Sequence, residues 1–151
     1  MEDLARVLSE HPFVAGLPEP QLRVIIGCTK NVRYAPGEYL SREDDEHEHA
    51  LYLLRHGTIG VESASPGREP TVVETLVPGD VCGVSWMTPG VRTHLDCRAR
   101  DNVLVFHIDG ECLKRKMDAD PTLGYAIASR LLASTYERLA RARLQKLDLY
   151  G

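Results

Sequence analysis

The sequence predicts a mainly β fold with flanking helices: an antiparallel β-roll, or jelly roll. Three observations support this. Residues 31–107 form short apolar runs separated by turn clusters, glycine recurs in those clusters, and residues 121–149 continue as one long helical pattern. We therefore expect a single domain, with a helical cap at residues 1–30, a β-roll at 31–109 and C-terminal helices at 110–151.

The N-terminal segment is expected to contain two short helices, at residues 2–8 and 20–28. Pro20 suits the start of the second helix, because proline at the first helical position lacks only an N–H that would be unpaired anyway. Phe13 and Leu17 lie between the helices and are predicted to anchor this cap to the roll.

The β-roll itself should begin after this cap. Residues 50–54 are almost continuously apolar, which is typical of a strand covered on both faces. The polar run at 42–48 reads as a solvated loop. Residues 78–80, Pro-Gly-Asp, predict a turn, and residues 84–88 predict about one turn of helix between strands.

Side chains alternate between apolar and polar from residue 91 to residue 99. Side chains two apart in a strand share a face, so Leu95, Cys97 and their odd-numbered neighbours should face the interior. In this phase Thr93 points inward and Arg92 points outward.

The C-terminal region predicts two further helices, with Asp109 as the N-cap of the first and Asp120 as the N-cap of the second. The second should run to Leu149, about 43 Å at 1.5 Å per residue, which is longer than a small roll can cover. Apolar and small residues at alternating steps of three and four indicate a seam for a partner helix: Leu132, Thr135, Leu139 and Ala142. The basic residues of this helix are predicted to form a solvated face: Arg138, Arg141, Arg143 and Lys146.

Composition excludes several classes of protein. The chain has 151 residues, of which 43% are hydrophobic and 26% charged, and no apolar run approaches the roughly 18 residues needed to span a bilayer. The acidic N-terminus lacks the features of a signal peptide, so we expect a cytoplasmic protein with no membrane association. A net charge of −4 argues against general binding to a nucleic-acid backbone.

The cysteines are widely spaced and contain no Cys-x-x-Cys pair. We expect no metal site from them, and we interpret all four as buried free thiols: Cys28, Cys82, Cys97 and Cys112.

Three stretches together carry a family resemblance: residues 34–40 (YAPGEYL), 50–61 (ALYLLRHGTIGV) and 76–83 (LVPGDVCG). With the following loop and helix pair, they resemble the cyclic-nucleotide-binding domain of the catabolite activator protein (Crp/Fnr-like) family. The resemblance implies a β-roll with a phosphate-binding cassette and a C-terminal dimer helix, no catalytic residue, and no cofactor beyond a small-molecule or cyclic nucleotide ligand.

The cassette departs from the family pattern at two points. The family has Gly-Glu, whose carboxylate accepts the ribose 2′-hydroxyl, whereas here Gly83 is followed by Val84. The family's Arg-small pair, which grips the cyclic phosphate, is matched by Arg92-Thr93, but in the wrong phase. An unpaired buried hydroxyl costs about 1–3 kcal/mol and a lost charged hydrogen bond about 1.5–3 kcal/mol, so we expect weak or no binding of cyclic AMP.

The candidate ligand site follows from the cassette. Trp86 is interpreted either as a side chain that fills the core or as a stacking platform for a planar ligand. Arg138 is interpreted either as one half of a salt bridge across a dimer interface or as a contact for an anion. The complete predicted set is Gly83, Val84, Ser85, Trp86, Arg92, Thr93 and Arg138.

We therefore predict a stand-alone regulatory module that binds a ligand other than cyclic AMP, or none, and acts as a homodimer through residues 121–149 with a protein partner. No winged helix-turn-helix follows the dimer helix, so direct DNA binding is not expected. One alternative is a working cyclic nucleotide sensor that uses Arg92-Thr93, and another is a purely structural dimerisation protein. A metal cupin enzyme is a third, suggested by His47 and His49, although neither the carboxylate nor the later histidine that it needs is in place.

Overall fold

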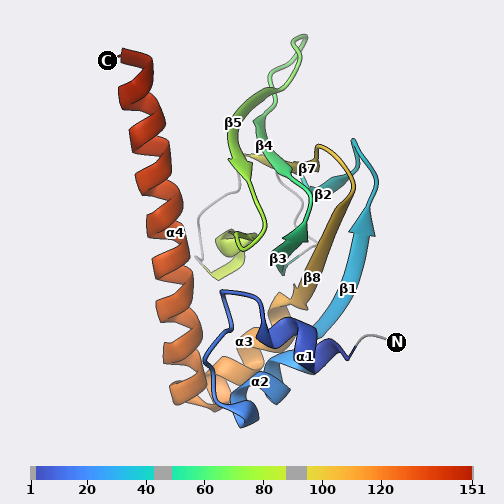
Figure 1. Ribbon diagram of the computed structural model, residues 1–151, viewed down its shortest axis with the longest axis vertical. Helices are drawn as coiled ribbons and strands as arrows, with labels where there is room; N and C mark the ends of the chain where they lie inside the picture. Colours follow the sequence, from blue (N-terminus) through green and yellow to red (C-terminus); the bar gives the residue numbers. More distant parts are fainter. Residues whose placement is uncertain (1–2, 43–48, 88–94, 151) are drawn as a thin grey trace.

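The computed structural model describes residues 3–42, 49–87 and 95–150 and contains two four-stranded antiparallel sheets with helices packed on one side (Figure 1). This confirms the predicted β-roll with flanking helices. Sheet A has the strand order β1 (Thr29–Tyr34), β8 (Val103–Asp109), β3 (Ala50–His56), β6 (Val81–Cys82). Sheet B has the order β2 (Tyr39–Ser41), β7 (Asp96–Ala99), β4 (Ile59–Ser63), β5 (Thr71–Leu76). The helices are α1 (Leu4–Ser9), α2 (Glu19–Ile26), the 3-10 turn η1 (Val84–Met87), α3 (Gly110–Ala119) and α4 (Pro121–Tyr150).

Sheet A lies between two apolar cores, which makes the molecule three layers deep. Alternate residues of β3 face opposite sides: Leu51 and Leu53 pack against the helices, while Tyr52 and Leu54 pack toward sheet B. All of residues 50–54 are buried, which confirms the two-sided cover that their continuous hydrophobicity predicts.

The N-terminal helices begin and end within two residues of the predicted limits. α1 begins at Leu4, because the Asp3 carboxylate accepts a hydrogen bond from the Ala5 amide at 3.1 Å and caps the helix. Between α1 and α2, Phe13 is buried in the helical core, as expected, and Leu17 packs against that core.

His11 fastens this N-terminal segment to sheet A. Its Nε2 donates to the carbonyl of Leu54 at 3.0 Å, and its Nδ1 accepts from the Phe13 amide at 3.1 Å. Burial lowers the pKa of His11, opposed in part by the bond to Leu54, so the folded protein favours the neutral imidazole.

The predicted Pro-Gly-Asp turn is confirmed. The Asp80 amide donates to the Val77 carbonyl at 3.0 Å, and the Val77 amide donates back to the Asp80 carboxylate at 2.9 Å. The turn leads directly into β6 and so fixes the start of the candidate site.

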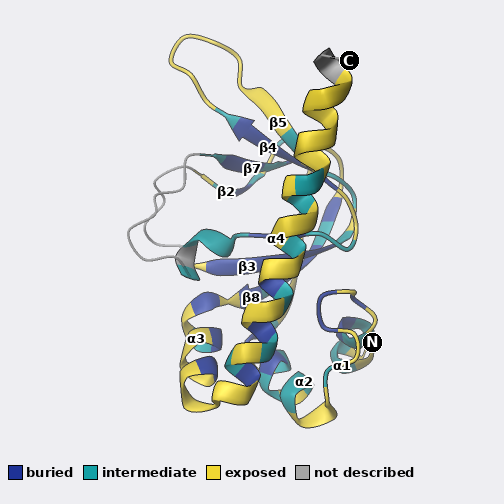
Figure 2. Cartoon of the chain, turned by 90° about the vertical axis from the view of Figure 1, so that its left-hand side faces the viewer, coloured by how far each residue is buried: buried dark blue, intermediate teal, exposed yellow. Residues whose placement is uncertain are grey.

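The two C-terminal helices have the predicted caps. Asp109 accepts from the Cys112 amide at 3.0 Å, and Asp120 accepts from the Thr122 amide at 3.1 Å. α4 has 30 residues and is therefore about 45 Å long. Its first half is partly buried through Leu123, Ile127 and Leu131, and its second half is largely exposed (Figure 2).

The prediction of four free thiols is wrong for one pair. Cys28 and Cys112 form a disulfide with a Cα–Cα distance of 5.7 Å. Cys28 directly precedes β1 and Cys112 follows β8, and the antiparallel pairing of these strands brings the two ends together. The two cysteines are 84 residues apart in the sequence, so their spacing gives no sign of this contact. Cys82 and Cys97 are buried free thiols, as expected.

None of the helices among the described residues is long and apolar enough to cross a membrane.

Candidate functional site

The cassette begins at Gly83, where the backbone leaves β6 in a left-handed conformation with φ of +94°. A Cβ at this position would collide with the carbonyl oxygen of Ala50 on β3. Both constraints require glycine at the point where the chain turns away from sheet A.

The predicted helical turn is present as η1, immediately after Gly83. Val84 is half-buried and packs against the helical core, as does Met87. Ser85 is half-buried. The predictions for Arg92 and Thr93, and for the side chain of Trp86, fall outside what the structure describes.

Strand β7 tests the predicted alternation. Cys97 and Ala99 are buried in the core between the sheets, and Leu95 packs against that core. On the opposite face Arg98 donates from Nε to the carbonyl of Gly37 at 2.9 Å, and Asp96 lies opposite Glu62 of β4. The phase is therefore confirmed from residue 95 to residue 99, and its extension to Arg92 and Thr93 stays a prediction.

Arg138 ties α4 to the roll. Its guanidinium forms two hydrogen bonds to the Glu74 carboxylate, at 2.8 and 2.7 Å, and donates a third to the Val81 carbonyl at 2.9 Å. The Glu74 carboxylate raises the pKa of Arg138, so the cation is held firmly charged. Arg138 therefore forms a salt bridge with Glu74 of its own chain, and neither of the two roles suggested by the sequence is seen.

Two further arginines of α4 face the body of the protein. Arg130 donates to the carbonyls of Phe13 and Ala15, both at 2.9 Å, and Arg141 donates to Asp80 at 2.9 Å. The interpretation of this basic segment as simply solvated is therefore wrong for Arg138 and Arg141. Their partners lie 57 to 64 residues away in sequence, so no local pattern could have identified them.

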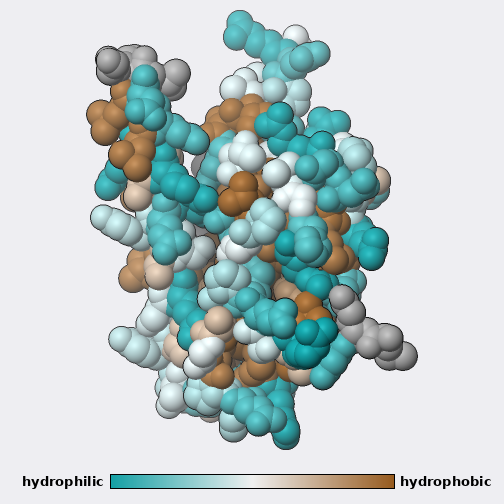
Figure 3. Space-filling model, in the orientation of Figure 1, coloured by the Kyte–Doolittle hydropathy of each residue, from teal (hydrophilic) through white to brown (hydrophobic). Residues whose placement is uncertain are grey.

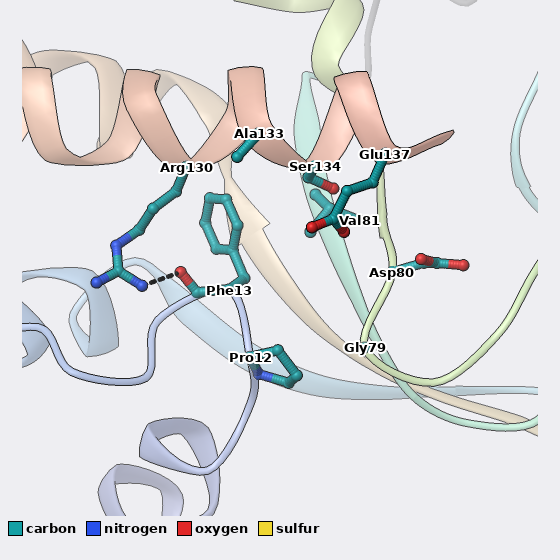
Figure 4. A pocket seen from close by; sticks show the side chains of 9 residues that line it. All are labelled: Pro12, Phe13, Gly79, Asp80, Val81, Arg130, Ala133, Ser134 and Glu137. Carbon is teal, nitrogen blue, oxygen red and sulfur yellow. Dashed lines mark hydrogen bonds between the residues drawn. The ribbon is translucent and has the colours of Figure 1, made fainter. Parts of the chain in front are cut away.

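A cavity of about 160 Å³ lies between α4, the Gly79-Asp80 turn and the Pro12-Phe13 loop (Figure 4). The side chains of Ser134 and Glu137 project from α4 toward the turn in this view, while Arg130 is occupied by the Phe13 carbonyl. None of the predicted site residues lines this cavity. Its lining holds no paired nucleophile and base, so we assign it no reaction. The full lining is Pro12, Phe13, Gly79, Asp80, Val81, Arg130, Ala133, Ser134 and Glu137.

The cupin alternative gains no support from the described residues. No group of three His, Cys, Asp or Glu side chains among them could hold a metal ion. His49 is exposed at the start of β3, and His47 lies outside the described ranges.

Comparison with known families identifies the domain. The family model for the cyclic nucleotide-binding domain matches residues 31–120, more than half of the chain. The chain belongs to the cyclic nucleotide-binding domain family. This agrees with the β-roll, the Pro-Gly-Asp turn and the short helix after Gly83, and it makes the chain a regulatory domain of this family. No curated protein matches the chain significantly in sequence.

Solved structures of other cyclic nucleotide-binding proteins share its fold. A putative cyclic nucleotide-binding protein from Geobacter metallireducens GS-15 is 23% identical, with a TM-score of 0.79, and the match covers 91% of this chain and 99% of that one. The catabolite activator protein of Thermus thermophilus is 21% identical, with a TM-score of 0.67, covering 92% and 62%. The regulatory subunit of a cAMP-independent protein kinase A from Trypanosoma cruzi, bound to guanosine, is 24% identical, with a TM-score of 0.62, covering 81% and 47%.

Proposed function

We propose that this cyclic nucleotide-binding domain is a sensor module that does not respond to cyclic AMP. Its cassette binds a different small molecule or is filled by its own side chains, and its output passes through a dimer to a protein partner. The observation that carries the proposal is Val84, which follows Gly83 and packs against the helical core. An isopropyl group accepts no hydrogen bond, so a ribose hydroxyl placed there would lose about 1–3 kcal/mol.

The phase of β7 supports loss of the phosphate contact as well. Leu95, Cys97 and Ala99 pack on the interior side. Continued by steps of two, this alternation turns Thr93 inward and Arg92 outward. Together the two departures reduce affinity for cyclic AMP by about a hundred- to ten-thousand-fold.

One structural relative suggests what such a pocket accommodates. The Trypanosoma cruzi regulatory subunit has the same fold and is described as cAMP-independent and bound to guanosine. A nucleoside has no phosphate and needs no arginine contact, so it avoids one of the two losses proposed here, while its ribose still lacks the acceptor that Val84 replaces. Guanosine is therefore a suitable first probe for this domain.

Isothermal titration calorimetry tests the proposal with cyclic AMP, cyclic GMP and guanosine. We expect dissociation constants weaker than about 100 μM for both cyclic nucleotides. Micromolar binding of cyclic AMP that is lost in Arg92→Ala, but kept in the control Arg100→Ala, would instead establish a working cyclic nucleotide sensor. Arg100 suits this control because it is exposed and lies one residue beyond β7.

The proposed dimer rests on the outward face of α4. Arg138 and Arg141 turn toward the body, whereas several large apolar side chains in the rest of α4 are exposed, and Figure 3 shows hydrophobic surface along the upper part of the helix. Leu132 is 73% exposed and Leu139 is 44% exposed, and they lie seven residues apart in the predicted seam. A second copy of this helix would cover both. The exposed apolar side chains of α4 are Tyr125, Leu132, Tyr136, Leu139, Leu144 and Leu147.

Light scattering tests this interface. We expect a dimer at tens of micromolar, and a monomer for Leu132→Asp combined with Leu139→Asp, because two carboxylates in an apolar seam lack partners. Gln145→Glu, an exposed position outside the predicted seam, is the matched control and should stay dimeric. A wild-type monomer under these conditions would refute the dimer.

A further inference from the structure

Two free thiols meet between the sheets of the roll. Cys82 ends β6 in sheet A and Cys97 lies on β7 in sheet B, and their sulfur atoms are 2.8 Å apart. Both side chains belong to the core between the sheets, where Cys82 is 3% exposed and Cys97 8% exposed. The contact therefore joins the two sheets at the points where the chain enters and leaves residues 83–96.

This geometry is close to that of a covalent bridge. A disulfide has a sulfur–sulfur distance of 2.03–2.05 Å, so the two atoms need to approach by only about 0.8 Å. Each side chain has a rotatable bond between Cα and Cβ that allows such a small movement.

The surroundings also distinguish the two sulfurs. A hydrogen bond from the Cys82 thiol lowers the pKa of Cys97, with smaller help from the Ser41 hydroxyl and the Arg138 cation, although burial opposes the change. The same hydrogen bond, together with burial, raises the pKa of Cys82. Cys97 is therefore the better nucleophile, and Cys82 is placed to resolve what forms on it.

We propose that Cys82 and Cys97 are a modification site for peroxides, at which hydrogen peroxide converts the thiol pair to a disulfide between the two sheets. The Cys97 thiolate attacks one peroxide oxygen, the O–O bond breaks, and the departing hydroxide takes up a proton to become water. The resulting sulfenic acid is attacked by the sulfur of Cys82, whose proton leaves with the displaced hydroxide as a second water. Two thiols lose two electrons and two protons, and one peroxide becomes two water molecules.

The burial of Cys82 and Cys97 limits which oxidants can react with them. Both thiols lie inside the roll, so a bulky disulfide such as oxidised glutathione has no room to form the mixed disulfide that exchange requires. Hydrogen peroxide is little larger than water and can reach the pair during small openings of the core. The bond would fix the two anchor points of residues 83–96 to each other.

Peptide mapping tests the site on the full chain. The reduced protein is treated with hydrogen peroxide, blocked with N-ethylmaleimide and digested with trypsin, which cleaves after Arg92, between the two cysteines. We expect residues 69–92 to be recovered in a disulfide with residues 93–98. Recovery of both peptides singly, as maleimide adducts or as sulfinic acids, would overturn the proposal.

Two controls separate this bond from the existing disulfide. The Cys28–Cys112 bridge gives a different linked pair, residues 24–30 with 101–114, and Cys28→Ser with Cys112→Ser removes it altogether. In that double variant peroxide should raise the unfolding temperature by about 5 °C or more, because the new bridge closes a loop of about 15 residues. Adding Cys82→Ser should abolish the shift. A shift that persists without Cys82 would contradict the assignment.

Discussion

The ion pair between Arg138 and Glu74 offers a quantitative test of how α4 is held to the roll. Arg138→Met removes the guanidinium but keeps most of the side-chain stem, so three hydrogen bonds of 2.7 to 2.9 Å are lost. Breaking a fully buried ion pair costs about 3–5 kcal/mol. Here the two side chains are 20% and 22% exposed, and water can solvate part of what remains. We expect the free energy of unfolding to fall by about 2–3 kcal/mol.

A double-mutant cycle isolates the pair itself. Urea denaturation of Arg138→Met, Glu74→Gln and the double variant should give a coupling energy of about 1–2 kcal/mol, because the two groups are in direct contact. Arg141→Met is the matched control on the same helix. Its side chain is 43% exposed and makes one hydrogen bond, so its loss should cost less than about 1 kcal/mol.

Two results would refute this reasoning. One is an Arg138→Met variant within about 0.5 kcal/mol of the wild type, since that is the range of an ordinary surface substitution. The other is an Arg138→Met variant whose dimer dissociates while the free energy of unfolding of the monomer is unchanged. The second result would place the salt bridge between chains rather than within one.

Two further perturbations test the cassette and the N-terminal anchor. In urea denaturation, Gly83→Ala should lower the free energy of unfolding by about 3 kcal/mol or more, because its Cβ meets the Ala50 carbonyl. Gly67 also has a positive φ but has open space around it, so Gly67→Ala should lower the free energy of unfolding by only about 1–2 kcal/mol. Equal losses in the two variants would contradict the steric argument. His11 has a pKa below its ordinary value of 6.5 when folded, so below pH 6.5 the unfolded chain binds protons more readily and stability falls as the pH drops through this range. His11→Gln should lose less stability with falling pH than the wild type. An identical pH profile would show that the pKa of His11 is not lowered in the folded protein.

The cysteines show where reading the sequence reaches its limit. Burial of Cys82 and Cys97 as free thiols was predictable, because free cysteine is among the most buried residue types. Nothing local indicated that Cys28 meets Cys112, because that contact arises only when β1 and β8 pair over a long separation.

Helix α4 shows the same division. Its start at Asp120 and Pro121 and its length were predictable, because capping and helical periodicity depend on neighbours in the sequence. The direction in which Arg138 points was not predictable, since Glu74 lies on β5 and 64 residues away.

The sequence by itself determined the β-roll, the turn at residues 78–80 and the helical turn after Gly83. Each of these follows from short-range patterns of hydrophobicity, proline and glycine. Only the tertiary structure decided which cysteines meet and that the α4 cations bind the roll. Those contacts depend on how strands and helices from distant parts of the chain pack, and the free energy that selects them comes from burial and charge pairing between segments that are not neighbours in sequence.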